Sequence, residues 1–297
     1  MHRSIRFLAA AVVLLAPLAA ANAQTAVNER HPLASGGRVE IGNVAGQVNI
    51  RGWDRDEVQL TGSLGEGQTL EVQSSSNRVQ LKVVYPRNNR NSRGAQLELR
   101  VPRAAELQAS TVSAGIDIAD VDLRRLQAQT VSGDLVVAGR TGEGVLGTVS
   151  GSIRSQLRTR RLEARTVSGG IDASGDTGGD VSAETVSGAV KLALSRVQRL
   201  DVESVSGDLG IRSGGLAPGG RISVQTVSAP VELSLPADTS AQLRVNSFSG
   251  RIQSDAGEVV RPRYGPGSRL DTRIGAGDGD ISISSHAGNV RVRLGNR

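Results

Sequence analysis

Thr130-Val131-Ser132-Gly133 is a four-residue phrase that recurs unchanged as Thr148-Val149-Ser150-Gly151, Thr166-Val167-Ser168-Gly169 and Thr185-Val186-Ser187-Gly188. Close variants begin at Thr111, Ser204, Thr226 and Ser247, so that successive phrases start 18 to 22 residues apart. A repeat of this length is typical of proteins built from stacked structural units. We therefore number each repeat from the first residue of its phrase, which is position 0.

Small or aliphatic residues alternate with polar ones on both sides of the phrase. In the repeat of Thr130, Leu126 and Ala128 occupy positions −4 and −2, and Leu135 and Val137 occupy positions +5 and +7. Among the central repeats, Gly144 is the exception at position −4. Alternation with a period of two predicts one short strand before the phrase and another after it. Because a repeat this short has no room for a helix, we predict an all-β fold, a β-solenoid with coils ~4.8 Å apart.

The phrase itself is predicted to be a bend. The two alternations are out of phase, which predicts that the threonine at position 0 and the valine at +1 both face the core, and that the serine at +2 faces outward. The glycine at +3 predicts a turn with positive φ. Phe248 and His286 occupy position +1 in their repeats. The large Phe248 side chain is expected to fill a widening core, and His286 is expected to be an end-of-stack substitution rather than a general base.

The same pattern fits two further segments, starting at Val39 and at Ile281, and brings the array to about ten coils of 18 to 22 residues. We predict a single solenoid domain over residues 38–297. Within it, residues 38–106 form the first coil and a strand-rich cap, 107–254 the regular coils, 255–280 a long loop, and 281–297 the last coil. A hairpin turn is predicted at residues 74–77, and residues 24–37 are predicted to be a flexible lead-in.

Residues 1–23 have the features of a secretory signal peptide. Arg3 and Arg6 precede an apolar stretch, and Ala21-Asn22-Ala23 forms a small-x-small cleavage site. We therefore expect export to the periplasm, the cell surface or the medium. Without Arg3 and Arg6 the formal net charge falls from +6 to +4. No later stretch approaches the ~20 apolar residues of a transmembrane helix, so none is predicted in the mature chain. The chain has no cysteine, and therefore no disulfide or lipidated cysteine is predicted.

The composition limits the partners that the chain is expected to bind. Trp53, Tyr85, Phe248 and Tyr264 are the aromatic residues of the predicted mature chain. This scarcity argues against a sugar-stacking groove and against a platform for nucleic-acid bases, which both need aromatic faces. Nearly all basic residues are arginines, which favour paired contacts with carboxylates.

Position −5 carries charges of alternating sign in six successive repeats: Glu106, Arg125, Glu143, Arg161, Asp180 and Arg199. Opposite charges one coil apart attract by a few tenths to ~1 kcal/mol. We predict a structural charge column that fixes the register of the coils. Further arginines are candidate contacts for lipopolysaccharide or an acidic polysaccharide, with a solvated surface as the alternative; these are Arg158, Arg160, Arg165, Arg261 and Arg263.

The chain resembles the bacterial putative-adhesin family of β-strand-repeat proteins, a domain of unknown function. The features that carry the resemblance are the signal peptide, the opening residues 37–54, the strand that ends at Pro102, and the serial Thr-Val-Ser-Gly phrases. The resemblance implies a β-solenoid that is exported or exposed at the cell surface, and it implies no catalytic residues.

No catalytic, cofactor-binding or metal-binding residue is predicted. Asp278 and Asp280, and the group of Asp117, Asp120 and Asp122, lack the repeated spacing of calcium-binding solenoids. We expect a non-enzymatic, structural or adhesion-like module that presents a flat polar surface to an envelope or extracellular protein or glycan. The alternatives are a polysaccharide-active β-helix enzyme and an envelope-stress or signalling accessory protein. The sequence is compatible with a monomer.

Overall fold

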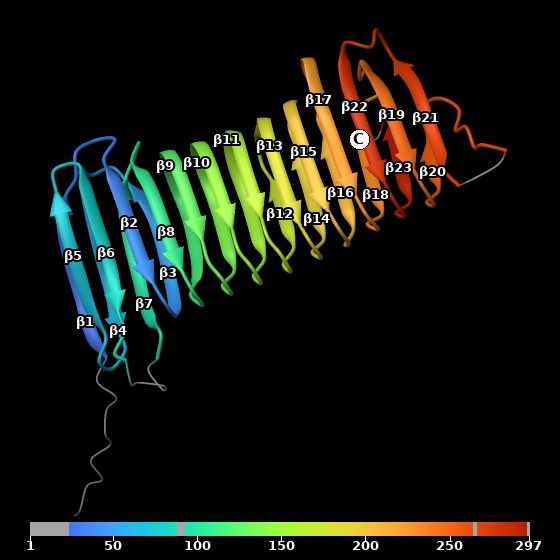
Figure 1. Cartoon of the computed structure of the whole chain (residues 1–297). Helices are drawn as coiled ribbons and strands as arrows, with labels where there is room; N and C mark the ends of the chain where they lie inside the picture. The colour runs from blue at the N-terminus through green and yellow to red at the C-terminus, as the bar shows by residue number, and fades with distance from the viewer. Residues whose placement is uncertain (1–23, 88–92, 264–265, 296–297) are drawn as a thin grey trace, which may run out of the picture.

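Coils of β-strand stack into an elongated array in the computed structural model, which describes residues 24–87, 93–263 and 266–295 (Figure 1). These residues form 23 strands and no helix. The predicted all-β solenoid is confirmed. The predicted signal peptide lies outside the described residues.

The coils build two facing sheets, and each coil contributes one strand or half-strand to each sheet. Sheet I contains, in spatial order, β5 (Thr69–Ser75), β6 (Arg78–Val84), β2 (Arg38–Asn43), β8 (Glu106–Thr111), the second halves of β9 (Gly115–Gln129), β10 (Leu135–Gly147) and β11 (Ile153–Arg165), then β13 (Thr177–Thr185), β15 (Val197–Ser204), β17 (Leu216–Thr226), β22 (Gly279–Ser285), β19 (Ala241–Ser247) and β21 (Ser268–Ile274).

Sheet II faces sheet I, and its strands are given from the same end of the array. It contains, in spatial order, β1 (Thr25–Pro32), β4 (Glu57–Leu64), β7 (Ala95–Pro102), β3 (Gly46–Trp53), the first halves of β9, β10 and β11, then β12 (Ile171–Ser174), β14 (Val190–Leu194), β16 (Leu209–Ser213), β18 (Val231–Leu235), β23 (Val290–Leu294) and β20 (Ile252–Ser254).

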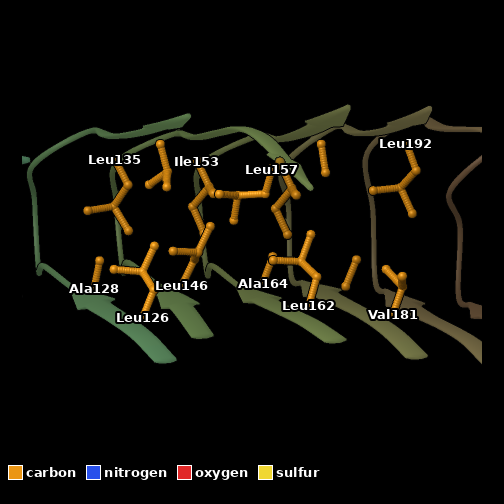
Figure 2. Packing of buried hydrophobic residues seen from close by; sticks show 14 of the residues in the cluster. Leu126, Ala128, Leu135, Leu146, Ile153, Leu157, Leu162, Ala164, Val181 and Leu192 are labelled. Atoms are coloured by element: carbon orange, nitrogen blue, oxygen red, sulfur yellow. The ribbon is translucent and has the colours of Figure 1, made fainter. Parts of the chain in front are cut away.

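The core is the thin space between the two sheets (Figure 2). Leu126 and Ala128 of sheet I face Leu135 of sheet II, and all three are fully buried. Positions −4, −2, +5 and +7 are therefore core positions, as the alternation predicts. Where Gly144 leaves a gap at −4, Leu157 fills it, because a Cβ added to Gly144 would lie 3.3 Å from the Leu157 side chain.

The two terminal coils do not lie at the ends of the array. β2 and β3 are inserted between the cap strands β6 and β7 and the coil of β8 and β9. Likewise β22 and β23 are inserted between the coil of β17 and β18 and the coil of β19 and β20. The coil of β22 and β23 is thus the last in sequence but the second-last in space, which corrects the sequential order that we predicted.

Antiparallel strands cover most of the stack's outer edges. β5 pairs with β6 through the predicted hairpin, and β4 pairs with β7. Residues 24–37 are not a flexible lead-in, because β1 within them pairs with β4 along its whole length. Residues 255–280 are not only a loop, because β21 within them pairs with β19. Covering an edge in this way protects unpaired backbone groups from strand addition by other chains.

The phrase forms the corner between the two sheets, but our prediction for its valine is wrong. Thr130 is buried, whereas Val131 is 44% exposed. The threonine hydroxyl accepts a hydrogen bond from the Gly133 amide at 3.1 Å and lies 3.3 Å from the Ala114 carbonyl oxygen of the preceding coil. Because the threonine hydroxyl is hydrogen-bonded to backbone groups inside the corner, the chain turns tightly there. The turn directs the side chains at +1 and +2 outward. Our prediction that the valine at +1 faces the core assumed that the strand with its period of two extends back from +5. It was wrong because the backbone at positions +1 to +3 is not extended.

The glycine at +3 is required for space rather than for positive φ, which also corrects our prediction. A Cβ placed on Gly169 would lie 1.7 Å from the carbonyl oxygen of Gly151 in the preceding coil. Gly46 and Gly207 are the +3 glycines with positive φ, near 109°. The coils that follow these two carry Ala114 and Ala229 at the same position. Alanine thus occurs at +3 where the +3 glycine of the preceding coil has positive φ, and so a different backbone orientation from the other +3 glycines.

Candidate binding groove along the valine ridge

The exposed valines at position +1 form one continuous row along a narrow edge of the array, which we call the valine ridge. Its members are Val44, Val112, Val131, Val149, Val167, Val186, Val205 and Val227, and each is 39–48% exposed. Backbone hydrogen bonds between neighbouring corners hold the row together, such as the bond from the Val131 amide to the Val112 carbonyl at 3.1 Å. The corners that carry the ridge follow the parallel strands of sheet I, whose ends form the lower edge of the stack in Figure 1.

An aromatic pair continues the ridge at its C-terminal end. The rings of Phe248 and His286 stack with their centroids 4.9 Å apart and an angle of 7° between their planes. The two residues are 38 positions apart in the sequence, and they meet because β19 pairs directly with β22. Phe248 is 52% exposed, so its ring does not fill the core as we predicted, and His286 is exposed as well. The pair instead extends an exposed apolar surface.

A groove of about 1060 Å³ runs beside this ridge. Valines form one wall, and residues at position −1, among them Arg165, Glu184, Glu203 and Gln225, form the other. Buried hydroxyls at position 0 form the floor in seven successive coils, which corresponds to a length of ~29 Å at the spacing of neighbouring strands; these residues are Thr148, Thr166, Thr185, Ser204, Thr226, Ser285 and Ser247. The groove is therefore long, apolar on one side and polar on the other.

Pro262 and residues 266–269 also line the groove. They do so together with Phe248, at its C-terminal end. On the polar wall, Arg165 pairs with Glu163 at 2.6 Å and with Glu184 at 3.0 Å. These ion pairs are at least one-third exposed and are worth at most ~1 kcal/mol each. Their main effect on a ligand is to fix where positive and negative charge lie along the groove.

The six residues of the predicted charge column lie on adjacent strands of sheet I. Strand register places Glu106 beside Arg125, Arg125 beside Glu143, and Arg161, Asp180 and Arg199 in succession. Arg125 and Glu143 form an ion pair at 2.6 Å, whereas Glu106 pairs with Arg38 and Arg124. The inserted strand β22 adds Asp280 beside Arg221. That the column fixes coil register remains a prediction.

The five candidate arginines do not form one site. Arg158 and Arg160 lie where β11 passes from sheet II to sheet I, and Arg158 pairs with Asp176 at 3.3 Å. Arg165 lies at the other end of the same half-strand, in the groove. Arg261 and Arg263 lie between β20 and β21, and both are exposed. Binding of an anionic ligand by these arginines remains a prediction, with Arg165 alone placed in the groove.

Three of the five aspartates that we considered as metal ligands have other partners. Asp117 pairs with Arg51 at 2.6 Å, and Asp278 accepts a hydrogen bond from the Ser240 hydroxyl at 2.9 Å. Asp280 pairs with Arg221 and Arg244. Over the described ranges, no three histidine or carboxylate side chains converge in a way that could hold a metal ion. Nor does this part of the chain contain a helix that is long and apolar enough to cross a membrane.

Comparison with known proteins identifies a family. The sequence model of the Toastrack DUF4097 domain matches residues 37–293. No curated protein matches the chain. A putative cell adhesion protein from Clostridium sporogenes is 10% identical, with 91% of this chain and 100% of that chain covered and a TM-score of 0.18. A putative adhesin from Bacteroides fragilis is 10% identical, with 92% and 98% covered and a TM-score of 0.36. At these values, neither structure supports an inference about function.

Proposed function

The chain belongs to the Toastrack DUF4097 family, a domain of unknown function, and from this premise we propose that it is an exported, non-enzymatic, adhesion-like module. It binds an envelope or extracellular partner along the valine ridge and the adjoining groove. Export is proposed from the signal-peptide features of residues 1–23. The surface that this chain offers to a partner is amphipathic, in contrast to the flat polar surface that we expected from the sequence.

The observation that carries the proposal is the length of the exposed apolar row. If a fully exposed valine offers roughly 150 Å², the eight half-exposed valines present on the order of 500 Å² in one continuous patch. This is the size of the largest apolar patch on a typical monomeric protein, and such patches are often functional. Single exposed valines are common on protein surfaces. An uninterrupted row of exposed valines over eight coils is not, and it therefore supports a binding role.

The character of the groove favours binding over catalysis. Its floor hydroxyls already interact with backbone groups, as Thr148 does with the Gly151 amide at 3.1 Å. Its walls hold an ion-paired arginine, Arg165, and separate carboxylates rather than a converging acid and base. A long groove with one apolar and one polar wall suits an elongated amphipathic partner.

The test is capture of envelope proteins and glycans by the purified predicted mature chain, residues 24–297. The double variant Val167→Ser/Val186→Ser should lose at least about tenfold in affinity for the captured partner, since it removes apolar contact from the centre of the ridge. Val136→Ser is the matched control, because Val136 is 37% exposed but lies outside the ridge. Equal binding by the ridge variant and the control would refute the proposal.

A further inference from the structure

We propose that the partner of the valine ridge is a second copy of this chain, docked ridge to ridge with the two arrays antiparallel. This inference rests on the proposed use of the ridge as a binding surface. It is carried by the repeat spacing of the ridge, by the charges beside it and by the area that it offers.

The spacing of the ridge matches another copy better than it matches a peptide. Neighbouring valines lie on adjacent strands and therefore repeat every ~4.8 Å. An extended peptide places same-face residues every ~6.8 Å, and a helix advances ~5.4 Å per turn. Both would lose register with the valines within a few coils. A second ridge has the same repeat, so each of its valines can lie opposite a valine of the first along the whole length.

Charges beside the ridge select one antiparallel arrangement. The ridge together with His286 and Phe248 has ten members, and its midpoint falls between Val167 and Val186. A two-fold axis at this midpoint, perpendicular to the ridge, brings the position −1 rows of both copies to the same side. Arg165 then faces the second copy's Glu184, and Glu184 faces the second copy's Arg165.

Shifting the axis by half a coil in either direction is unfavourable. An axis centred on the coil of Val186 places Glu184 opposite the same carboxylate of the second copy. An axis centred on the coil of Val167 places Arg165 opposite the same guanidinium. Like charges face to face repel and suppress wrong registers. The midpoint axis avoids both contacts, and it also places Gln129 opposite the second copy's Gln225.

The available area is sufficient for a stable dimer. The valines offer on the order of 500 Å² of apolar surface per copy, and the exposed serines at +2 and the polar residues at −1 flank them. Together these rows approach the ~800 Å² per partner of a standard interface. An apolar centre bordered by polar rows is the usual arrangement of such interfaces.

Cysteine cross-linking tests the arrangement without background, because the chain has no cysteine. Gln129→Cys and Gln225→Cys variants of residues 24–297 are mixed in equal amounts and oxidised. The antiparallel register predicts disulfide-linked heterodimers of the two variants. Homodimers of Gln129→Cys would indicate a different antiparallel register, centred on the coil of Val131, and absence of any cross-link at high concentration would indicate a monomer or another arrangement. Either result would overturn the inference.

Sedimentation equilibrium measures the same association without cross-links. The unmodified protein should dimerise reversibly, and Val167→Asp should weaken dimerisation by at least about tenfold, whereas Val136→Asp should not. Arg165→Glu should also weaken it, and Arg165→Glu/Glu184→Arg should restore it. If the protein stays monomeric while the ridge variant still loses a captured partner, the second copy is excluded but the proposed binding surface stands. If ridge and control variants behave alike in both assays, both proposals fail.

Discussion

Replacement of Gly169 by alanine should destabilise the array by about 3 kcal/mol or more. A Cβ at Gly169 would lie 1.7 Å from the Gly151 carbonyl oxygen, whereas ordinary contact begins near 3.4 Å. Relief of this overlap requires a displacement of about 1.7 Å, roughly a third of the ~4.8 Å between coils. Such a displacement disrupts the bonds from the Val167 and Ser168 amides to the Val149 carbonyl, now 3.2 and 2.9 Å. Two backbone hydrogen bonds at ~1 kcal/mol each, added to overpacking strain of ~1–3 kcal/mol, give the estimate.

Ala229→Gly is the matched control, because it changes the same corner position in the opposite direction. It should cost about 1 kcal/mol or less, the entropic difference between alanine and glycine in regular structure. Urea unfolding followed by far-ultraviolet circular dichroism measures both, with the slope of the transition checked for constancy. If Gly169→Ala unfolds within about 0.5 kcal/mol of the unmodified protein, the stacked carbonyl is not what excludes a side chain at +3.

Three further substitutions test other parts of the fold by the same unfolding measurement. Thr148→Val should cost about 1–3 kcal/mol, since it leaves the buried Gly151 amide without its acceptor; the exposed Ser150→Ala should stay within about 0.5 kcal/mol, and equal losses would contradict the role given to the hydroxyl. Glu143→Arg removes the ion pair with Arg125 and should cost a few tenths to ~1 kcal/mol, with the loss shrinking in 1 M salt; a loss that does not depend on salt would argue against the charge column. Leu157→Ala should cost about 2–5 kcal/mol because it removes the fully buried side chain that packs nearest to Gly144, and a loss below about 1 kcal/mol would show that the site collapses.

The alternation of the sequence was enough to predict the core. Leu126 and Ala128 lie in one extended strand, and Leu135 and Val137 in another, so that a period of two applies to each separately. Within one extended strand, sequence distance alone decides which face a side chain occupies. The predicted hairpin at residues 74–77 is confirmed for the same reason, since two alternating strands meet there.

The order of the coils could not be predicted from the repeat. Membership of the array depends on the local pattern, and the segments at Val39 and Ile281 satisfy it. Their neighbours depend on which strand edges remain open after the intervening segments fold back as β5 or β21. A weak signal was present in the charges. Asp280 beside Arg221 places a carboxylate next to an arginine, whereas Gln242, the neighbour expected from sequence order, carries no charge.

The valine ridge could not be predicted from the sequence, because the turn at the corner interrupts the period of two. The turn that provides backbone partners for the threonine hydroxyl must expose the two residues that follow. Position +2 is serine in each of the eight phrases, as expected for an exposed corner, but position +1 is valine in seven of them, and Val44 adds an eighth valine to the ridge. Stacking of neighbouring valines buries about half of each side chain and accounts for part of this preference. The other half stays exposed to water in every coil, and packing within one copy does not explain it. The binding partner that we propose for the ridge would explain it.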